Sequence, residues 1–358
     1  MEKEKVETKE SIKEEKSAVE LRLKRKDFNV LDSALACSAF IVLQLLATIV
    51  VDFLPETIKQ SFTVAFLLSV LVEAVFVFAV LIVASKRSVE FVNATTIKKK
   101  PDFLSVLIAV AISVICLFSF TGLTNTFVNV LYKLGYSSSA SLTVPNFFVY
   151  LIYVFLLCIV PAFCEDLLFR GCILSGLRKL GDHKAVIISA VIFMLMHGGP
   201  DQTVHQLIIG VVLGYAFIAS GTIWVPVIVH FFNNFIALTA AYITRNVEVV
   251  ETVVPTWGQI FLQFASAIVT AIIGVYLVYF CLEALKKIRK KKETDKEQIE
   301  INKESEEANE VGEQLVEKVQ ESPENLNQKE KKLTKLYFIL SGIYLVLNWV
   351  LAFVGGLL

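Results

Sequence analysis

The sequence CEDLLFRG at residues 164–171 places two adjacent carboxylates and an arginine at the end of an otherwise uncharged run, residues 146–164. That run is long enough to cross most of a bilayer as a helix. Ionisable residues at membrane depth are rare, face the bundle interior or a wet cavity, and mark functional sites. On a helix, Asp166 and Arg170 stand at i,i+4 and can pair, whereas Glu165 is rotated away from both. The pattern predicts one acid that is paired and one that is free.

The composition of the whole chain indicates a membrane protein. Of its 358 residues, 55% are hydrophobic and 19% are charged, and the mean hydropathy is +0.65. This balance is too apolar for a soluble globular protein and predicts an all-α polytopic helix bundle. The net charge is zero, so nothing favours nucleic acid as a partner. The six cysteines lie in or beside apolar runs without C-x-x-C spacing, which indicates packing roles and neither a disulfide framework nor a cysteine metal site.

The pattern of charge and hydropathy divides the chain into four parts. We predict a charged cytosolic arm (1–27), an eight-span membrane core (28–285), a charged cytosolic linker (286–335) and a C-terminal membrane helix (336–358). The eight core spans are the apolar runs 33–51, 62–85, 103–121, 146–164, 185–196, 206–220, 222–242 and 257–282.

The basic residues predict how this bundle is oriented. They are concentrated at every second connection between the apolar runs, for example at residues 98–100 and 286–292. By the positive-inside rule these connections face the cytosol, and so does the amino terminus. The chain is therefore expected to be an integral, multi-pass membrane protein, in the plasma membrane if its source is bacterial.

Further polar residues fall at a depth that matches Glu165. His197 follows directly after the fifth run, while His230 and Asn234 lie one helical turn apart on the seventh. Glu165 and His197 stand at equal distances from the predicted cytosolic turn between their helices, roughly 20 Å along each. His230 and Asn234 reach a similar depth from their own cytosolic turn. The four side chains are expected to converge inside the bundle.

These residues form three short motifs on separate hydrophobic helices: Glu165-Asp166-x-x-x-Arg170, Phe193-x-x-x-His197 and His230-x-x-x-Asn234. In order and spacing they resemble the three motifs of the CAAX protease and bacteriocin-processing family of intramembrane peptidases. The resemblance covers residues 146–242. That family usually has Glu-Glu where this chain has Glu165-Asp166, a departure that leaves the first glutamate unchanged.

The resemblance implies a role for each motif. Glu165 and His197 would activate a water for attack on a peptide carbonyl, and His230 and Asn234 would stabilise the oxyanion, with no metal; Asp166 and Arg170 would support the site. Taken alone, the residues leave a second interpretation open. Glu165 and the two histidines also make up a His2Glu set, which is a known arrangement for catalytic zinc. The chain lacks the His-Glu-x-x-His helix that presents two zinc ligands from one element.

Two kinds of function are compatible with these motifs. The first is an intramembrane endopeptidase that cleaves a membrane-associated protein or peptide substrate. The second is a non-catalytic protein that binds a membrane signalling partner, such as a sensor kinase, or provides bacteriocin immunity. A free acid beside a paired one favours the enzyme. Outside the motifs, Glu73 is expected to make a structural hydrogen bond within the second run, and His183 and His205 are expected to be solvated.

Overall fold

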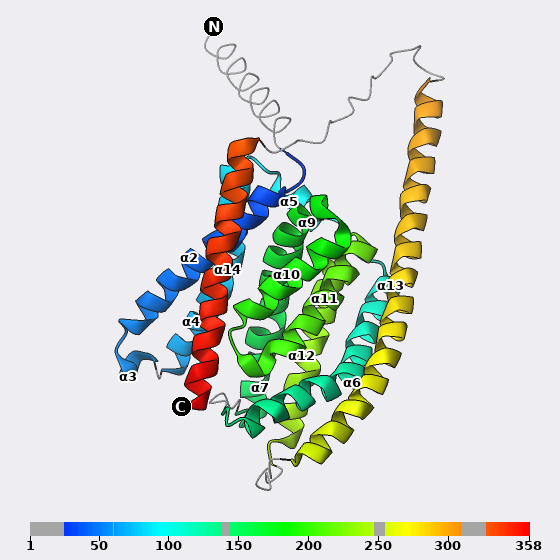
Figure 1. Cartoon of the computed structure of the whole chain (residues 1–358). Coiled ribbons are helices and arrows are strands. Elements are labelled where there is room, and N and C mark those ends of the chain that lie inside the picture. The colour runs from blue at the N-terminus through cyan, green and yellow to red at the C-terminus, as the bar shows by residue number, and fades with distance from the viewer. Residues whose placement is uncertain (1–24, 60, 138–142, 247–254, 309–326) are drawn as a thin grey trace.

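The computed structural model describes residues 25–59, 61–137, 143–246, 255–308 and 327–358 (Figure 1). Most of the predicted arm, residues 1–24, and residues 309–326 of the predicted linker lie outside these ranges. Over the described residues the fold is all-α, as predicted, and the only extended pairing there is an isolated bridge between Arg25 and Val89.

Eight helical segments of the described chain are long and apolar enough to cross a bilayer. One of them is the continuous helical column from Phe147 to Leu180. The other seven are α2 (Val30–Asp52), α4 (Phe62–Lys86), α6 (Phe103–Lys133), α11 (Thr203–Ser220), α12 (Trp224–Thr244), α13 (Trp257–Ala308) and α14 (Gln328–Leu357). Most of the residues in each apolar segment are not buried in the protein, so these faces are available to lipid. The polytopic bundle expected from the sequence is confirmed.

The fifth predicted span differs from the others in length. It is the helix α10 (Asp182–Met196), whose 15 residues extend about 22 Å and so fall short of a bilayer core of about 30 Å. The helix ends at His197, which is its C-cap residue. A short α10 therefore stops the chain within the bundle and presents His197 at depth. Three short helices, α3 (Glu56–Lys59), α5 (Phe91–Ala94) and the 3₁₀ turn η4 (Pro200–Gln202), lie in the connections.

The column Phe147–Leu180 lies in the middle of the bundle. Its segments pack against α2, α4, α10 and α12, and one buried apolar cluster joins these helices. A second cluster joins α6, α11, α12 and α13. Figure 1 shows α13 along one edge of the bundle and α14 against α2. The central column is thus enclosed on several sides by other helices.

Both helices that flank the predicted linker are longer than the apolar pattern indicated. α13 continues past the expected end at residue 282 to Ala308, and in Figure 1 it projects beyond the bundle. Its extension is rich in Lys and Glu, which are good helix formers, and Arg289 Nε lies 2.8 Å from Glu293 Oε1 at i,i+4. α14 begins at Gln328 and not at residue 336, because Asn327 and Glu330 form a capping box there.

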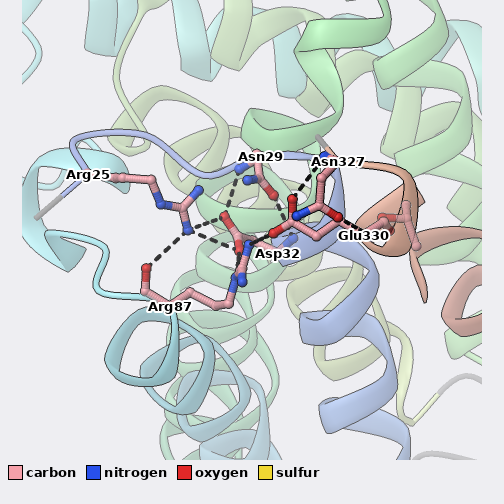
Figure 2. Close-up of polar contacts among 7 residues, drawn as sticks. Arg25, Asn29, Asp32, Arg87, Asn327 and Glu330 are labelled. Atoms are coloured by element: carbon pink, nitrogen blue, oxygen red, sulfur yellow. Dashed lines mark hydrogen bonds and ion pairs between the residues drawn. The ribbon is translucent and has the colours of Figure 1, made fainter. Parts of the chain in front are cut away.

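A buried carboxylate fixes one end of the bundle. Asp32, in the first turn of α2, has no exposed surface. Arg25 Nη2 lies 2.9 Å from Asp32 Oδ2 and Arg87 Nε lies 2.9 Å from Asp32 Oδ1; both arginines point at this carboxylate in Figure 2. Because one buried acid receives two guanidinium groups, the segment before α2, α2 itself and the end of α4 are held together.

The same cluster connects the C-terminal helix to the bundle. Arg87 Nη2 lies 3.1 Å from Glu330 Oε1 in the first turn of α14 (Figure 2). Further along this helix, Ser341 Oγ lies 2.9 Å from Ser38 Oγ on α2. α14 presents most of its surface outward, so these polar contacts do much to fix its position against α2.

Candidate active site

The helical column that carries the first motif changes its winding twice. It runs through α7 (Phe147–Tyr153), the π-helical turn η1 (Val154–Ile159), α8 (Val160–Asp166), the π-helical turn η2 (Leu167–Leu174), α9 (Ser175–Leu177) and the 3₁₀ turn η3 (Arg178–Leu180). Pro161 follows the first π-turn and has no N–H to donate back along the helix. Such turns are frequent at functional sites. The two acids therefore lie at the end of α8, between two irregular turns.

Arg170 and Asp166 form a fully buried ion pair. Arg170 Nη1 lies 2.9 Å from Asp166 Oδ1, with 1% and 0% of the side chains exposed, and the contact lacks hydrogen-bond alignment. Arg170 Nη2 also donates to the carbonyl of Gly210 at 3.3 Å, and the guanidinium carbon lies 4.5 Å from the centre of the Phe193 ring. The i,i+4 contact expected from the sequence is present, and the arginine has charge, carbonyl and aromatic partners.

Asp166 has a second partner, which the sequence did not indicate. His230 Nδ1 lies 3.2 Å from Asp166 Oδ2. Because an ionised carboxylate can only accept, the hydrogen-bond network assigns the proton to Nδ1. The opposite nitrogen, Nε2, lies 4.0 Å from Glu165 Oε2. Asp166 therefore balances Arg170 with one oxygen and orients His230 with the other.

His197 approaches Glu165 from the end of α10. Its Nδ1 lies 2.9 Å from the backbone carbonyl of Phe193, which fixes the proton on Nδ1. Its Nε2 lies 3.9 Å from Glu165 Oε2. The ring of Phe193 packs edge-on against both imidazoles, with ring centres 4.6 Å from His197 and 6.0 Å from His230. The phenylalanine of the second motif thus contacts Arg170 and both histidines.

Glu165, the other acid of the first motif, is buried between the two histidines. Only 7% of the residue is exposed, and within the described residues its Oε2 has no hydrogen-bond partner. The atom lies between the two Nε2 atoms of His197 and His230, at 3.9 and 4.0 Å. The structure therefore brings these three predicted site residues together from three helices.

Asn234 lies one turn beyond His230 on α12 and is held by a chain of amide contacts. Its Nδ2 donates to the carbonyl of Leu157 at 3.0 Å. Leu157 belongs to the π-helical turn η1, which ends shortly before Pro161. One N–H of the Asn234 amide remains for another partner.

Two residues that the sequence analysis did not assign to the site, Asn233 and His205, complete this chain of contacts. Asn233 Nδ2 donates to Asn234 Oδ1 at 3.3 Å and contacts His205 Nε2, also at 3.3 Å. An amide nitrogen carries two hydrogens, so both contacts can be made at once. They orient the Asn234 amide with its oxygen toward Asn233 and its nitrogen toward Leu157. The adjacent Asn233-Asn234 pair, one turn after His230, was the available sequence signal.

The sequence-based interpretation of His205 as a solvated loop residue is wrong. His205 is partly buried in the first turn of α11 and is close enough to His197 and His230 to interact electrostatically with both. Glu73 also differs from expectation. Its Oε2 is buried without a hydrogen-bond partner in the described residues, and the carboxylate interacts with Glu165. Helix α4 thus contributes a further acid beside the site, where only a structural hydrogen bond was expected.

The C-terminal helix covers the loop that follows His197. Trp349 Nε1 on α14 donates to Thr203 Oγ1, at the start of α11, at 2.9 Å. Gly198 has φ = +66°, a conformation that favours glycine, and Asn348 Nδ2 lies 3.1 Å from where a Cβ would stand on it. A side chain at residue 198 would strain the turn and press on α14.

The spacing of the three ionisable groups bears on the choice between water and zinc. Zinc with bonds of about 2.0–2.2 Å brings tetrahedral ligand atoms to about 3.3–3.5 Å from one another. A single water with hydrogen bonds of about 2.8 Å spans atoms about 4–4.6 Å apart. Separations of 3.9 and 4.0 Å lie between the two values, so this geometry is compatible with a bound water and with zinc, and no group of three His, Cys, Asp or Glu in the described part of the chain is already spaced for a metal ion. Both Nε2 atoms nevertheless carry the free lone pair that zinc requires.

Comparison with known families agrees with the motifs. Residues 146–236 match the family model described as type II CAAX prenyl endopeptidase Rce1-like. The match covers about a quarter of the chain, includes all three motifs and confirms the resemblance to the CAAX protease and bacteriocin-processing family. It implies a membrane protease of the CAAX type. In the same comparisons no curated protein and no solved structure matched the chain.

Replacement of His205 tests whether the amide chain orients Asn234. His205→Leu removes the acceptor for Asn233, whereas His205→Gln can supply an oxygen close to the position of Nε2. We expect the leucine variant to lower kcat for peptide hydrolysis about tenfold with KM unchanged, because about one hydrogen bond of orientation is lost. The glutamine variant should retain most of the rate. Equal rates for leucine and glutamine, measured on purified protein with matched unfolding temperatures, would exclude the orienting role.

Proposed function

We propose that this protein is an intramembrane endopeptidase that hydrolyses a peptide bond of a membrane-associated protein or peptide. The observation that carries the proposal is the position of Glu165 Oε2, which is buried, without a hydrogen-bond partner in the described residues, and between two imidazole nitrogens at 3.9 and 4.0 Å. The adjacent acid, Asp166, is by contrast paired with Arg170 and His230. An acid kept free beside a paired one is suited to proton transfer.

Glu165 and His197 activate the attacking water. The proton on His197 Nδ1 is held by the Phe193 carbonyl, so Nε2 accepts a hydrogen bond from a water that also reaches Glu165. Glu165 takes a proton from the water while the water oxygen attacks the peptide carbonyl. Once protonated, the same carboxyl donates to the leaving amine. Apolar surroundings disfavour the charged form of a carboxyl, which helps one group to act first as base and then as acid.

His230 and Asn234 stabilise the oxyanion. An imidazole with its proton on Nδ1 donates from Nε2 only when it is also protonated there, and Asp166 is placed to stabilise that imidazolium. The second N–H of the Asn234 amide, beyond the one that Leu157 accepts, supplies another donor. Each preorganised donor in a water-poor site contributes about 3 kcal/mol to stabilisation of the transition state.

The substrate can be found by comparing termini. Membrane-protein and secreted-peptide termini would be compared between cells that carry the intact chain and cells that carry Glu165→Gln, with Glu283→Gln on α13 as a matched control. We expect uncleaved species to accumulate only with Glu165→Gln, because it keeps the shape of the side chain but removes the base. Identical termini in all three strains, with equal protein levels, would contradict an endopeptidase and favour a non-catalytic membrane partner.

Metal dependence is tested on the purified enzyme. We propose that the reaction needs no metal, so activity should survive prolonged chelation, and His230→Ala should slow turnover by roughly a hundredfold or more through loss of one oxyanion donor. In the zinc alternative, Glu165, His197 and His230 are ligands and the metal supplies the activated water. Stoichiometric zinc that is lost together with activity in both His197→Ala and His230→Ala would overturn the metal-free proposal.

A further inference from the structure

A basic pocket lies at the end of the bundle where α12 begins, and none of the candidate active-site residues line it. It is a cavity of about 690 Å³ between the α5–α6 connection, the turn from α11 to α12 and the extension of α13. Six basic side chains line it: Lys98, Lys99, Lys100, Arg289, Lys292 and Lys296. Three acids, Asp102, Glu293 and Asp295, line it as well. The pocket therefore carries a surplus of positive charge.

The acids in the pocket are mostly engaged by particular partners. Lys292 Nζ lies 2.7 Å from Asp102 Oδ2, and Arg289 Nε lies 2.8 Å from Glu293 Oε1. Burial raises the pKa of Asp102, but Lys292 and the backbone and hydroxyl of Ser105 outweigh it and hold the pKa below its ordinary value. Asp102 thus stays ionised and forms an ion pair with Lys292. The lysines at 98–100 have no ion pair within the described residues, so their charge remains for a ligand.

The backbone that presents these lysines is held in place. Trp224 Nε1 donates to the carbonyl of Ile97 at 2.8 Å, and the backbone N–H of Ile223 donates to Thr96 Oγ1 at 3.1 Å. The hydroxyl of Thr222 donates to the carbonyl of Lys99. Thr96 itself has φ = +57°, an uncommon conformation for a side chain of this shape. Three contacts to the start of α12 therefore fix a loop in a strained shape that gathers three like charges.

The location of the pocket indicates a lipid ligand. Directly after Asp102, Phe103 and Leu104 begin α6 with 77% and 54% of their surfaces exposed, as expected for side chains against acyl chains. A phosphate held by residues 98–100 would thus have its attached chains beside an apolar surface. Basic pockets between membrane helices on the cytoplasmic side bind anionic head groups. Like charges gathered on a fixed loop also repel one another unless an anion lies between them.

We propose that this pocket binds the phosphate head group of an anionic phospholipid, with the lysines at 98–100 on one wall and Arg289 and Lys296 on the other. The inference does not depend on peptidase activity, and its test reads lipid binding alone. A single lysine near a membrane surface contributes about a fivefold change in affinity, so three together contribute about a hundredfold.

The test compares two triple variants of the full chain. The first is Lys98→Gln with Lys99→Gln and Lys100→Gln; the control is Lys331→Gln with Lys332→Gln and Lys335→Gln on α14, which removes equal charge from exposed lysines outside the pocket. Each protein is purified from nanodiscs of phosphatidylcholine with phosphatidylglycerol, and retained lipid is counted by native mass spectrometry. We expect the intact chain and the control to retain phosphatidylglycerol, and the pocket variant to bind it about a hundredfold more weakly.

Other outcomes would overturn the proposal. Equal loss in both triple variants would indicate a diffuse surface effect without a site. Stabilisation of the intact chain by inorganic phosphate, without preference for phosphatidylglycerol over phosphatidylcholine, would indicate free phosphate as the ligand. If the pocket variant does not fold, Lys296→Gln on the opposite wall replaces it, with an expected loss of about fivefold; unchanged retention in that variant would also count against the pocket.

Discussion

The site depends on the need to neutralise one buried arginine. Arg170 lies in the centre of the bundle with 1% of its side chain exposed, where an unpaired charge would cost several kcal/mol. Asp166 supplies the counter-charge, Phe193 adds a cation–π contact and the Gly210 carbonyl accepts one hydrogen bond. Because Asp166 also holds His230, the same ion pair that makes the arginine tolerable sets the position and tautomer of a proposed catalytic residue. Stability and chemistry therefore share one carboxylate.

The other motif residues follow from this constraint. Phe193 packs on Arg170 and on both imidazoles, and its carbonyl orients His197. The aromatic residue of the second motif therefore contacts residues of the first and third motifs. The π-helical turn η1 contributes the Leu157 carbonyl, which accepts from the Asn234 amide. Glu165 is the side chain that this network leaves free. The candidate site is thus a paired frame around Glu165, with Glu73 of α4 as a second buried acid beside it.

Much of this arrangement could be predicted from the sequence, because it depends on helical periodicity and depth. The spacing of Asp166 and Arg170, and the equal depths of Glu165 and His197, follow from residue counts along helices. The links through Asn233 and His205 could not be predicted, since they depend on which side chains of separate helices meet. The C-terminal end of α13 was missed because Lys and Glu continue this helix after the apolar pattern stops. The start of α14 was missed because an Asn cap begins this helix before the apolar pattern does.

The measurement that tests the account most directly is thermal unfolding of purified Glu165→Gln and Asp166→Asn side by side. Asp166→Asn leaves the buried Arg170 without its counter-charge and frees His230, so we expect a loss of about 3–5 kcal/mol in the free energy of unfolding. Glu165→Gln removes a buried charge whose Oε2 accepts no hydrogen bond in the described part of the chain, and it should unfold at the same temperature as the intact chain or higher. Equal destabilisation by both changes would contradict the account, because it would mean that the two acids together form a structural pair for Arg170.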